Sequence, residues 1–233
     1  MIYNRPRRQK AEATVALSTL AVGSTIKINE NGAAADYLVV HQGRPSTVYD
    51  DSCIGTWVMR VDCPVLRMIN SANESAYAGG VVDTYLEGEF YNSFDSAAQS
   101  AIKQVKIPYV DGNGKTGTLK TGSSGLLRRV FVASGKELRL ESQTNDRMYD
   151  VGATFSYFNS HLSDAARIAN WNGAPTQYWC RDPAKGYTTN MWMVGNNGRL
   201  AEAGASNWKA VRPVMVLNNA ALVGTDSGIL KGV

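Results

Sequence analysis

Residues 177–217 constrain the fold most strongly, because they read as the closing strands of a sheet. An apolar run from Met191, a Gly-Asn-Asn-Gly break and a return strand predict a β-hairpin over residues 191–203, since glycine and asparagine tolerate the positive φ of tight turns. Residues 211–217 are apolar except for Arg212 and predict a buried strand. Pro213 lacks an N–H, so we expect it at a sheet edge or at the beginning of that strand.

The rest of the chain alternates short apolar runs with turn signals. Its 233 residues, 44% of them hydrophobic, suffice for a substantial core, and the 22 glycines favour a loop-rich fold dominated by strands. Residues 20–28 and 37–41 predict a hairpin around an Asn31-Gly32 turn, and a third strand follows over residues 56–61. Apolar residues at helical spacing predict a helix over residues 75–89. Asp95 is expected to cap a second helix and Asp164 a short third one.

Charge and cysteine content exclude several classes. The net charge of +4 comes from 24 basic and 20 acidic residues, much of it near the N-terminus, so no basic stripe predicts a nucleic-acid partner. No run approaches the roughly 20 apolar residues of a membrane span, and no apolar segment follows the basic N-terminus as in a signal peptide. Cys53, Cys63 and Cys180 form no CxxC motif, and we expect three reduced, mostly buried thiols. A Cys53–Cys63 pair is the alternative.

Residues 1–13 are polar and predict an arm that docks onto a partner protein. A disordered tail is the alternative interpretation. We expect residues 14–233 to form a single domain. The arm residues predicted to bind the partner are Tyr3, Arg5, Arg7 and Arg8.

No pattern predicts catalysis. His41 and His161 lie in no zinc-binding spacing, no GxSxG elbow marks a nucleophile, and the adjacent Asp50 and Asp51 are expected to be solvated. The glycine-rich residues 112–116 fail as a phosphate loop, because Tyr109 stands where the motif needs its first glycine. We therefore expect no enzyme activity, no catalytic residue, no metal and no cofactor.

Several segments together resemble an uncharacterised domain family common in phages and prophages of gut bacteria. The likeness covers nearly the whole chain, and its more specific parts are residues 178–183, which stand where the family has Trp-Trp-Leu-Arg-Ser-Pro, and residues 211–217, which match its Val-Arg-Pro-Ala-Leu-Val-Leu ending. Cys180 and Asp182 depart from the first motif. Further matching segments are residues 3–9, 22–25, 38–43, 85–88 with Phe94, 102–109, 156–158 and 167–169.

These closing motifs are similar to those of C-type-lectin-like folds, which include formylglycine-generating enzymes and phage tail adhesins. The resemblance implies an α+β, C-type-lectin-like fold of mixed short strands, two or three helices and long loops. The enzyme branch uses a paired-cysteine copper site near the C-terminus, and Cys180 has no partner cysteine nearby. The adhesin branch presents a binding face on its C-terminal loops.

The resemblance thus implies a phage virion protein, assembled in the bacterial cytoplasm, that acts as a tail-associated receptor-binding adhesin. Its partners would be other phage structural proteins, through the arm, and a bacterial cell-surface glycan or protein; a homo-oligomer, commonly a trimer among adhesins, is expected. A structural virion component without a receptor, as in capsid decoration or a baseplate, and a glycan-acting enzyme are the alternatives.

The C-terminal region mixes aromatic residues with amides, a composition typical of binding surfaces. Trp192, in mid-strand, has a core position as its alternative. Arg212 is expected to anchor a carboxylate such as Asp182 or Asp164. The predicted ligand-binding residues are Tyr187, Asn190, Trp192, Asn196, Asn197, Arg199, Asn207 and Trp208, and the predicted structural residues are Trp179, Arg181, Arg212 and Pro213.

Overall fold

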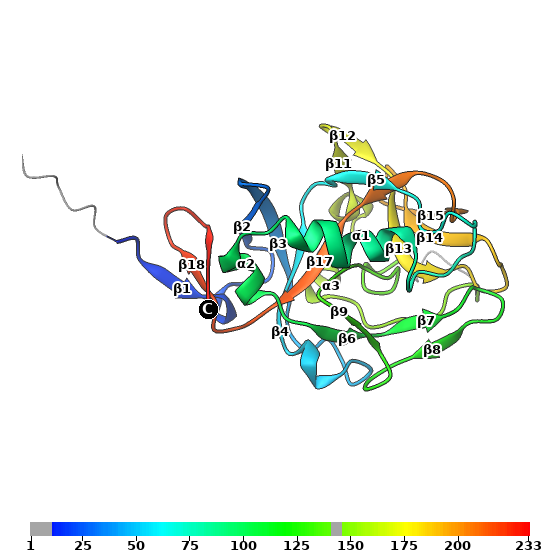
Figure 1. The fold of residues 1–233 in the computed structure, drawn as a ribbon, viewed down its shortest axis with the longest axis horizontal. Coiled ribbons are helices and arrows are strands. Elements are labelled where there is room, and N and C mark those ends of the chain that lie inside the picture. The colour runs from blue at the N-terminus through cyan, green and yellow to red at the C-terminus, as the bar shows by residue number, and fades with distance from the viewer. Residues whose placement is uncertain (1–10, 141–145) are drawn as a thin grey trace, which may run out of the picture.

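Strands dominate the computed structural model, which describes residues 11–140 and 146–233 (Figure 1). They account for 39% of the chain against 15% for helices, and they form several separate sheets. The strand-rich fold expected from the glycines and turn signals is therefore confirmed. The α+β, C-type-lectin-like expectation is wrong, because the helices make up only this small share and much of the expected loop is paired into short strands.

The first large sheet is antiparallel, in the order β10-β17-β4-β3-β2. Asn31 and Gly32 adopt φ values of 49° and 77° between β2 and β3, which confirms the predicted hairpin turn. Tyr37, Trp57 and Phe131 on these strands are fully buried. The strands of this sheet are β2 (Thr25–Glu30), β3 (Ala33–Gly43), β4 (Gly55–Arg60), β10 (Val130–Val132) and β17 (Pro213–Leu217).

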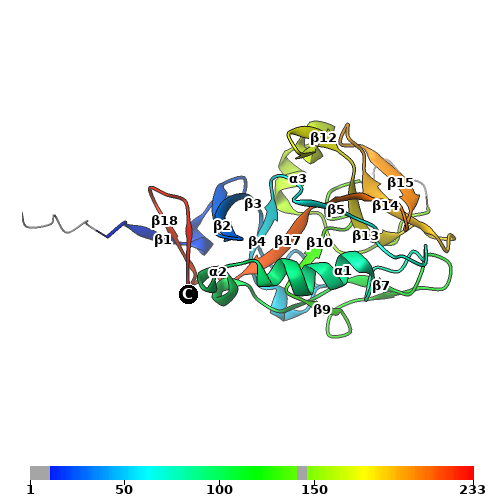
Figure 2. The ribbon, with the colours of Figure 1, turned by 45° about the horizontal axis from the view of Figure 1, so that its top comes forward.

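The second large sheet has the order β15-β14-β13-β16-β5 and contains the predicted C-terminal hairpin as β14 and β15. Its strands are antiparallel except for β13 and β16, which run parallel. Figure 2 shows this sheet at the end of the molecule away from β1 (Thr14–Ala16) and β18 (Leu222–Gly224). Its strands are β5 (Val65–Arg67), β13 (Tyr178–Pro183), β14 (Asn190–Val194), β15 (Leu200–Gly204) and β16 (Lys209–Val211).

Arg212 links the two large sheets, since the chain leaves β16 of one and enters β17 of the other on either side of it. Its guanidinium donates to the carbonyls of Arg60 (2.9 Å) and Arg167 (3.3 Å) and to the Tyr178 hydroxyl (3.1 Å). The expected carboxylate partner is thus replaced by backbone carbonyls that converge where the sheets meet. Pro213 begins β17, as expected.

The helix predicted over residues 75–89 forms only from Val81, as α1 (Val81–Tyr85) followed by the π-helix η3 (Leu86–Phe90). Gly79 has φ +74°, and a Cβ on Gly80 would lie 2.5 Å from the Ile69 carbonyl oxygen. The pair therefore belongs to a tight turn rather than a helix. Tyr77, one of the apolar residues within the predicted range, precedes the helix and is buried.

Two further helical predictions differ in outcome. Asp95 caps α2 (Ser96–Ala101), since its Oδ1 accepts the Ala98 N–H at 2.8 Å. Asp164 caps no helix; it lies inside the 3₁₀ helix η5 (Asp164–Arg167), where its carboxylate pairs with Arg167.

Short strands and turns complete the fold. The glycine-rich residues 112–116 connect β7 to β8, and these two strands pair with each other. The three cysteines are free and buried, as predicted. No helix of the described residues is long and apolar enough to cross a membrane. The remaining elements are β1 (Thr14–Ala16), β6 (Val105–Ile107), β7 (Tyr109–Asp111), β8 (Thr118–Lys120), β9 (Leu126–Arg128), β11 (Ala169–Trp171), β12 (Ala174–Thr176), β18 (Leu222–Gly224), β19 (Leu230–Gly232), α3 (Ser156–Ser160), η1 (Leu17–Thr19) and η2 (Asp51–Cys53).

Candidate functional site

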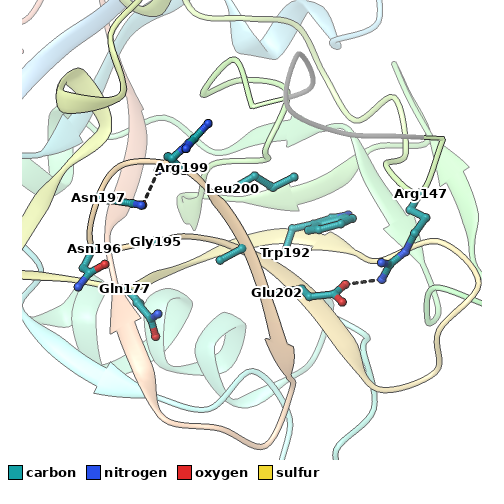
Figure 3. Close-up of a pocket in the computed structure, with 10 residues that line it drawn as sticks. Arg147, Gln177, Trp192, Gly195, Asn196, Asn197, Arg199, Leu200 and Glu202 are labelled. Atoms are coloured by element: carbon teal, nitrogen blue, oxygen red, sulfur yellow. Dashed lines mark hydrogen bonds and ion pairs between the residues drawn. The ribbon is translucent and has the colours of Figure 1, made fainter.

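A cavity of about 630 Å³ opens on the β14–β15 hairpin (Figure 3). We call it the hairpin groove. Its volume lies within the range of about 300–1,000 Å³ that is usual for small-ligand sites. The lining side chains come from both strands, their turn, the residue just before β13 and the segment before α3: Arg147, Gln177, Trp192, Asn196, Asn197, Arg199, Leu200 and Glu202.

The hairpin register determines which side chains face the groove. Trp192 lies directly opposite Glu202, and Val194 lies opposite Leu200. Because side chains alternate along a strand and opposed residues share a face, these four project to one side of the sheet. In Figure 3 the Trp192 ring is flanked by Leu200 on one side and by Arg147 on the other.

Arg147 forms one wall of the groove. It forms an ion pair with Glu202, and its guanidinium carbon lies 4.3 Å from the Tyr187 ring centre and 5.4 Å from that of Trp192. A planar guanidinium between two aromatic faces is held by cation–π attraction as well as by charge. Tyr187, 44% exposed, therefore stands at the rim of the groove.

The hairpin turn packs against η5 and is held there by contacts of Gly198. Gly198 has φ +78°, and a Cβ there would lie 1.8 Å from the Asp164 carbonyl oxygen, so only glycine fits. The Gly198 carbonyl accepts the Nε–H of the buried Arg167 at 2.8 Å. Within the turn, Asn197 Oδ1 accepts the Arg199 backbone N–H at 3.1 Å. A turn held in this way presents its side chains already ordered for binding.

Trp192 carries a buried polar group that has no partner among the described residues. Its side chain is only 5% exposed, and no acceptor in the described part of the chain lies within hydrogen-bond distance of its Nε1–H. Buried indole N–H groups normally have a partner, and leaving one unpaired costs about 1–3 kcal/mol. A ligand oxygen in the groove would supply that partner.

A second, smaller cavity of about 290 Å³ adjoins the hairpin groove, and we call it the Trp208 pocket. Gln177 and Asn196 line both cavities, so the two lie side by side. Trp208 is 57% exposed, more than any other tryptophan of the chain. Its ring could therefore stack against a ligand. The pocket is lined by Leu66, Trp171, Pro175, Thr176, Gln177, Asn196, Trp208 and Lys209.

The structure brings most of the predicted ligand-binding residues together. Trp192, Asn196, Asn197 and Arg199 line the groove, Trp208 lines the adjoining pocket and Tyr187 stacks on the groove wall. Asn190 instead accepts the Thr189 hydroxyl proton at 2.9 Å, and neither it nor Asn207 lines either cavity.

Sequence reasoning missed Arg147, Gln177, Glu202 and Lys209. Only Glu202 carried a usable signal, because a hairpin register counted from the Gly-Asn-Asn-Gly turn places it opposite Trp192.

The predicted structural residues lie in the core. The Trp179 Nε1–H donates to the Arg67 carbonyl at 2.8 Å, and Arg181 is fully buried against Glu137. The predicted partner-binding residues Tyr3, Arg5, Arg7 and Arg8 fall outside the described residues.

Other titratable residues serve local structure. His41 Nδ1 lies 2.8 Å from the Ser156 hydroxyl and accepts the Ser156 N–H at the start of α3, and burial lowers the pKa of His41. Asp50 Oδ1 accepts the Ser52 N–H at 2.9 Å, and Asp51 pairs with Arg44. Within residues 11–140 and 146–233, no three His, Cys, Asp or Glu residues are grouped as a metal site would need.

The family described as Domain of unknown function (DUF6273) matches residues 55–219. The matched range runs from β4 to just beyond β17 and includes every residue that lines the groove and the Trp208 pocket. Strands β1 to β3, β18 and β19 lie outside it. No curated protein and no solved structure matches the chain.

Proposed function

The chain belongs to the DUF6273 family, and we propose that it is a phage virion protein, a tail-associated adhesin that binds a bacterial cell-surface glycan in the hairpin groove and the Trp208 pocket. The observation that carries this proposal is the buried Nε1–H of Trp192, which has no acceptor among the described residues and lies in a polar groove. The phage location is supported by the sequence resemblance described above.

A glycan suits the groove better than a protein surface does. Sugar hydroxyls both donate and accept hydrogen bonds, and their rings have one apolar face. The groove offers donors at Trp192 and Arg199, an acceptor at Glu202 and groups of both kinds at Gln177 and Asn196. Concave sites of this size enclose small ligands, whereas protein partners need larger and flatter surfaces.

The placement of the two ends supports attachment to a particle. The sheet of β1, β18 and β19 lies at one end of the molecule and the β14–β15 hairpin at the other in both views (Figures 1 and 2). An arm that precedes β1 would therefore hold the protein by the end opposite its groove. Glu12 fastens this end, because its carboxylate accepts the Ser227 N–H and pairs with Lys231.

The glycan-acting enzyme is less well supported. Most glycoside hydrolases flank the scissile bond with two carboxyl groups. The residues that line the groove include one carboxylate, Glu202, and it is paired with Arg147.

The test is binding of the purified full chain to a panel of intact bacterial strains, compared with an Asn196→Ala/Trp208→Ala variant. Both side chains are exposed, so the variant should fold normally. Leu162→Ala, which truncates another exposed apolar side chain outside both cavities, is the matched control. We expect saturable binding that the double variant loses and the control keeps. A folded wild-type protein that binds no strain would favour a structural virion component.

Attachment is tested separately by deleting residues 1–10, which leaves the contacts of Glu12 in place. We expect a folded protein that no longer enters the particle. Unchanged virion content would contradict the role of Tyr3, Arg5, Arg7 and Arg8 in the arm.

A further inference from the structure

We infer that the ligand is an anionic glycan, whose acid group binds beside the Lys209 ammonium where the hairpin groove meets the Trp208 pocket. This inference rests on the proposed function and specifies the chemical class of the ligand. The ligand would be a sugar chain that carries a negatively charged group, either a carboxylate or a phosphate.

The two cavities are lined by three cations, Arg147, Arg199 and Lys209, and by one carboxylate, Glu202. This excess is local. The whole chain carries a net charge of +4, and four of its basic residues, Arg5, Arg7, Arg8 and Lys10, lie in the N-terminal segment outside the described residues. The remaining residues are therefore neutral overall, and a positive lining points to an anionic ligand.

Two of the three cations keep charge available for a ligand. Arg147 is paired with Glu202. Arg199 lies 3.4 Å from a carboxylate oxygen of Asp164, but the buried Arg167 occupies the other oxygen of that group, and Arg199 is 65% exposed. One carboxylate between two guanidiniums leaves a positive surplus at Arg199.

Lys209 lies at the junction of the two cavities. Its ammonium donates to Gln177 Oε1 at 2.7 Å, and Gln177 lines both cavities. No carboxylate in the described parts of the chain lies within ion-pair distance of Lys209. An amide oxygen orients this ammonium without neutralising it, so an acid group of the ligand can form a charge-assisted hydrogen bond there.

Trp208 precedes Lys209 in the chain and lines the same pocket. A sugar ring stacked on the exposed indole would bring an acid substituent within reach of the ammonium. Stacking supplies apolar contact that tolerates different sugars, and the cation selects those that carry charge. The same arrangement predicts that added salt weakens binding, because the ammonium is partly solvated.

The test uses surface polysaccharide extracted from a strain that the protein binds. It is compared in native form, after reduction of its carboxyl groups to alcohols, and after removal of phosphate with hydrofluoric acid. Wild type, Lys209→Gln and Lys27→Gln are titrated with each. Lys27→Gln removes an equal charge on β2, outside both cavities, and is the matched control.

We expect one of the two treatments to weaken wild-type binding at least about tenfold, which identifies the acid group as carboxylate or phosphate. Lys209→Gln should weaken binding to the native polysaccharide by about five- to tenfold and should bind native and treated material alike. Lys27→Gln should behave as wild type.

Three results separate failure of this inference from failure of the proposed function. Wild-type binding that survives both treatments overturns the anionic ligand and leaves the glycan-binding function intact. Native binding that is unchanged in Lys209→Gln overturns the position of the acid group. A folded wild-type protein that binds no strain removes the proposed function, and the inference with it.

Discussion

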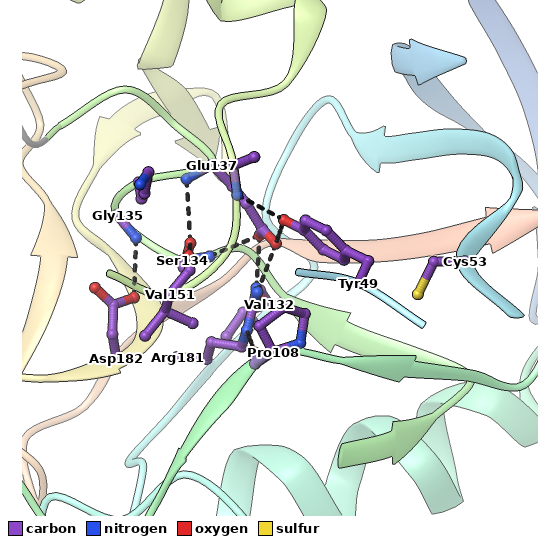
Figure 4. Close-up of polar contacts among 12 residues, drawn as sticks. Tyr49, Cys53, Pro108, Val132, Ser134, Gly135, Glu137, Val151, Arg181 and Asp182 are labelled. Atoms are coloured by element: carbon purple, nitrogen blue, oxygen red, sulfur yellow. Dashed lines mark hydrogen bonds and ion pairs between the residues drawn. The ribbon is translucent and has the colours of Figure 1, made fainter. Parts of the chain in front are cut away.

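Two arginine–glutamate pairs in this protein have the same chemistry and different surroundings. Arg181 and Glu137 are both 0% exposed, and the guanidinium also donates to the carbonyls of Pro108 and Val132 (Figure 4). Arg147 and Glu202, 28% and 33% exposed, stand in the groove wall. A desolvated pair persists only where every polar atom has a partner, whereas a solvated pair contributes little to stability and can exchange partners. Burial thus assigns one pair to the fold, whereas the other is a partly exposed part of the groove wall.

The largest expected effect is that of breaking the buried pair. Arg181→Met removes the guanidinium and leaves the Glu137 carboxylate buried without its ion-pair partner, which should lower the free energy of unfolding by about 3–5 kcal/mol. Arg147→Met should cost at most about 1 kcal/mol, because its pair is partly solvated. Urea unfolding followed by tryptophan fluorescence measures both. Equal losses would contradict the comparison. Should Arg181→Met not fold, Glu137→Gln, which retains the volume, should still destabilise the protein more than Glu202→Gln does.

Asp182 extends the comparison, because its buried carboxyl group is next to Arg181 in the chain but does not form the ion pair. The Arg181 guanidinium pairs with Glu137 instead. One oxygen of Asp182 accepts the Gly135 N–H at 2.9 Å. Burial raises the pKa of Asp182 from 3.8 to about 7. The folded protein therefore holds this proton more tightly than the unfolded chain does. Stability should fall as the pH rises from about 4 to about 7 and should stay low above that range.

The measurement is the melting temperature of wild type and Asp182→Asn between pH 5 and 8. The amide keeps the acceptor for Gly135 without a charge, so the variant should melt higher than wild type at pH 8, and the difference should shrink toward pH 5. His41 acts in the opposite direction below its ordinary pKa of 6.5, because burial lowers its pKa. Only the difference between the two proteins therefore isolates Asp182. Asp150→Asn, at an exposed carboxylate, is the control and should leave the pH dependence of the melting temperature unchanged. A difference in melting temperature between wild type and Asp182→Asn that stays constant from pH 5 to 8 would contradict the prediction.

The sequence predicts those parts of the site that depend on local chain chemistry. The Gly-Asn-Asn-Gly turn predicts the β14–β15 hairpin, and with it the neighbourhood of Trp192, Asn196 and Arg199. Arg147 reaches the groove from a segment 45 residues before Trp192 in the chain, and nothing in its local pattern indicates that contact. Residues brought together by tertiary packing leave no periodic signal.

The same limit explains two errors in the predicted fold. Tyr77 fits the helical spacing of apolar residues, but it lies before the helix and is buried by tertiary packing. The turn at Gly79 and Gly80 makes α1 begin only at Val81. Arg212 was expected to pair with a carboxylate because a buried cation needs acceptors. Carbonyls at the junction of two sheets meet that need equally well, and strand order cannot be read from composition.

The solvated pair should matter for binding more than for stability. Arg147→Met removes the stacking partner of Tyr187 and Trp192 and releases Glu202, so affinity for a strain recognised by wild type should fall about tenfold, equivalent to about 1.4 kcal/mol. Titration of fluorescently labelled protein onto cells measures the loss. Arg44→Met, at an exposed ion pair outside both cavities, is the matched control. Unchanged affinity in Arg147→Met would remove this pair from the site.

Trp192→Phe should cause the smallest change in stability. This variant tests whether the Trp192 Nε1–H contributes to folding or to ligand binding. Phenylalanine keeps most of the packing but lacks the Nε1–H, which has no acceptor among the described residues. The packing loss and the removal of an unsatisfied donor oppose each other, so the free energy of unfolding should change by less than about 1 kcal/mol. Affinity should nevertheless fall about five- to tenfold, because the hydrogen bond to the ligand is lost. A variant that binds as wild type would show that the N–H does not contact the ligand, and the groove would then lose the observation that most directly supports it.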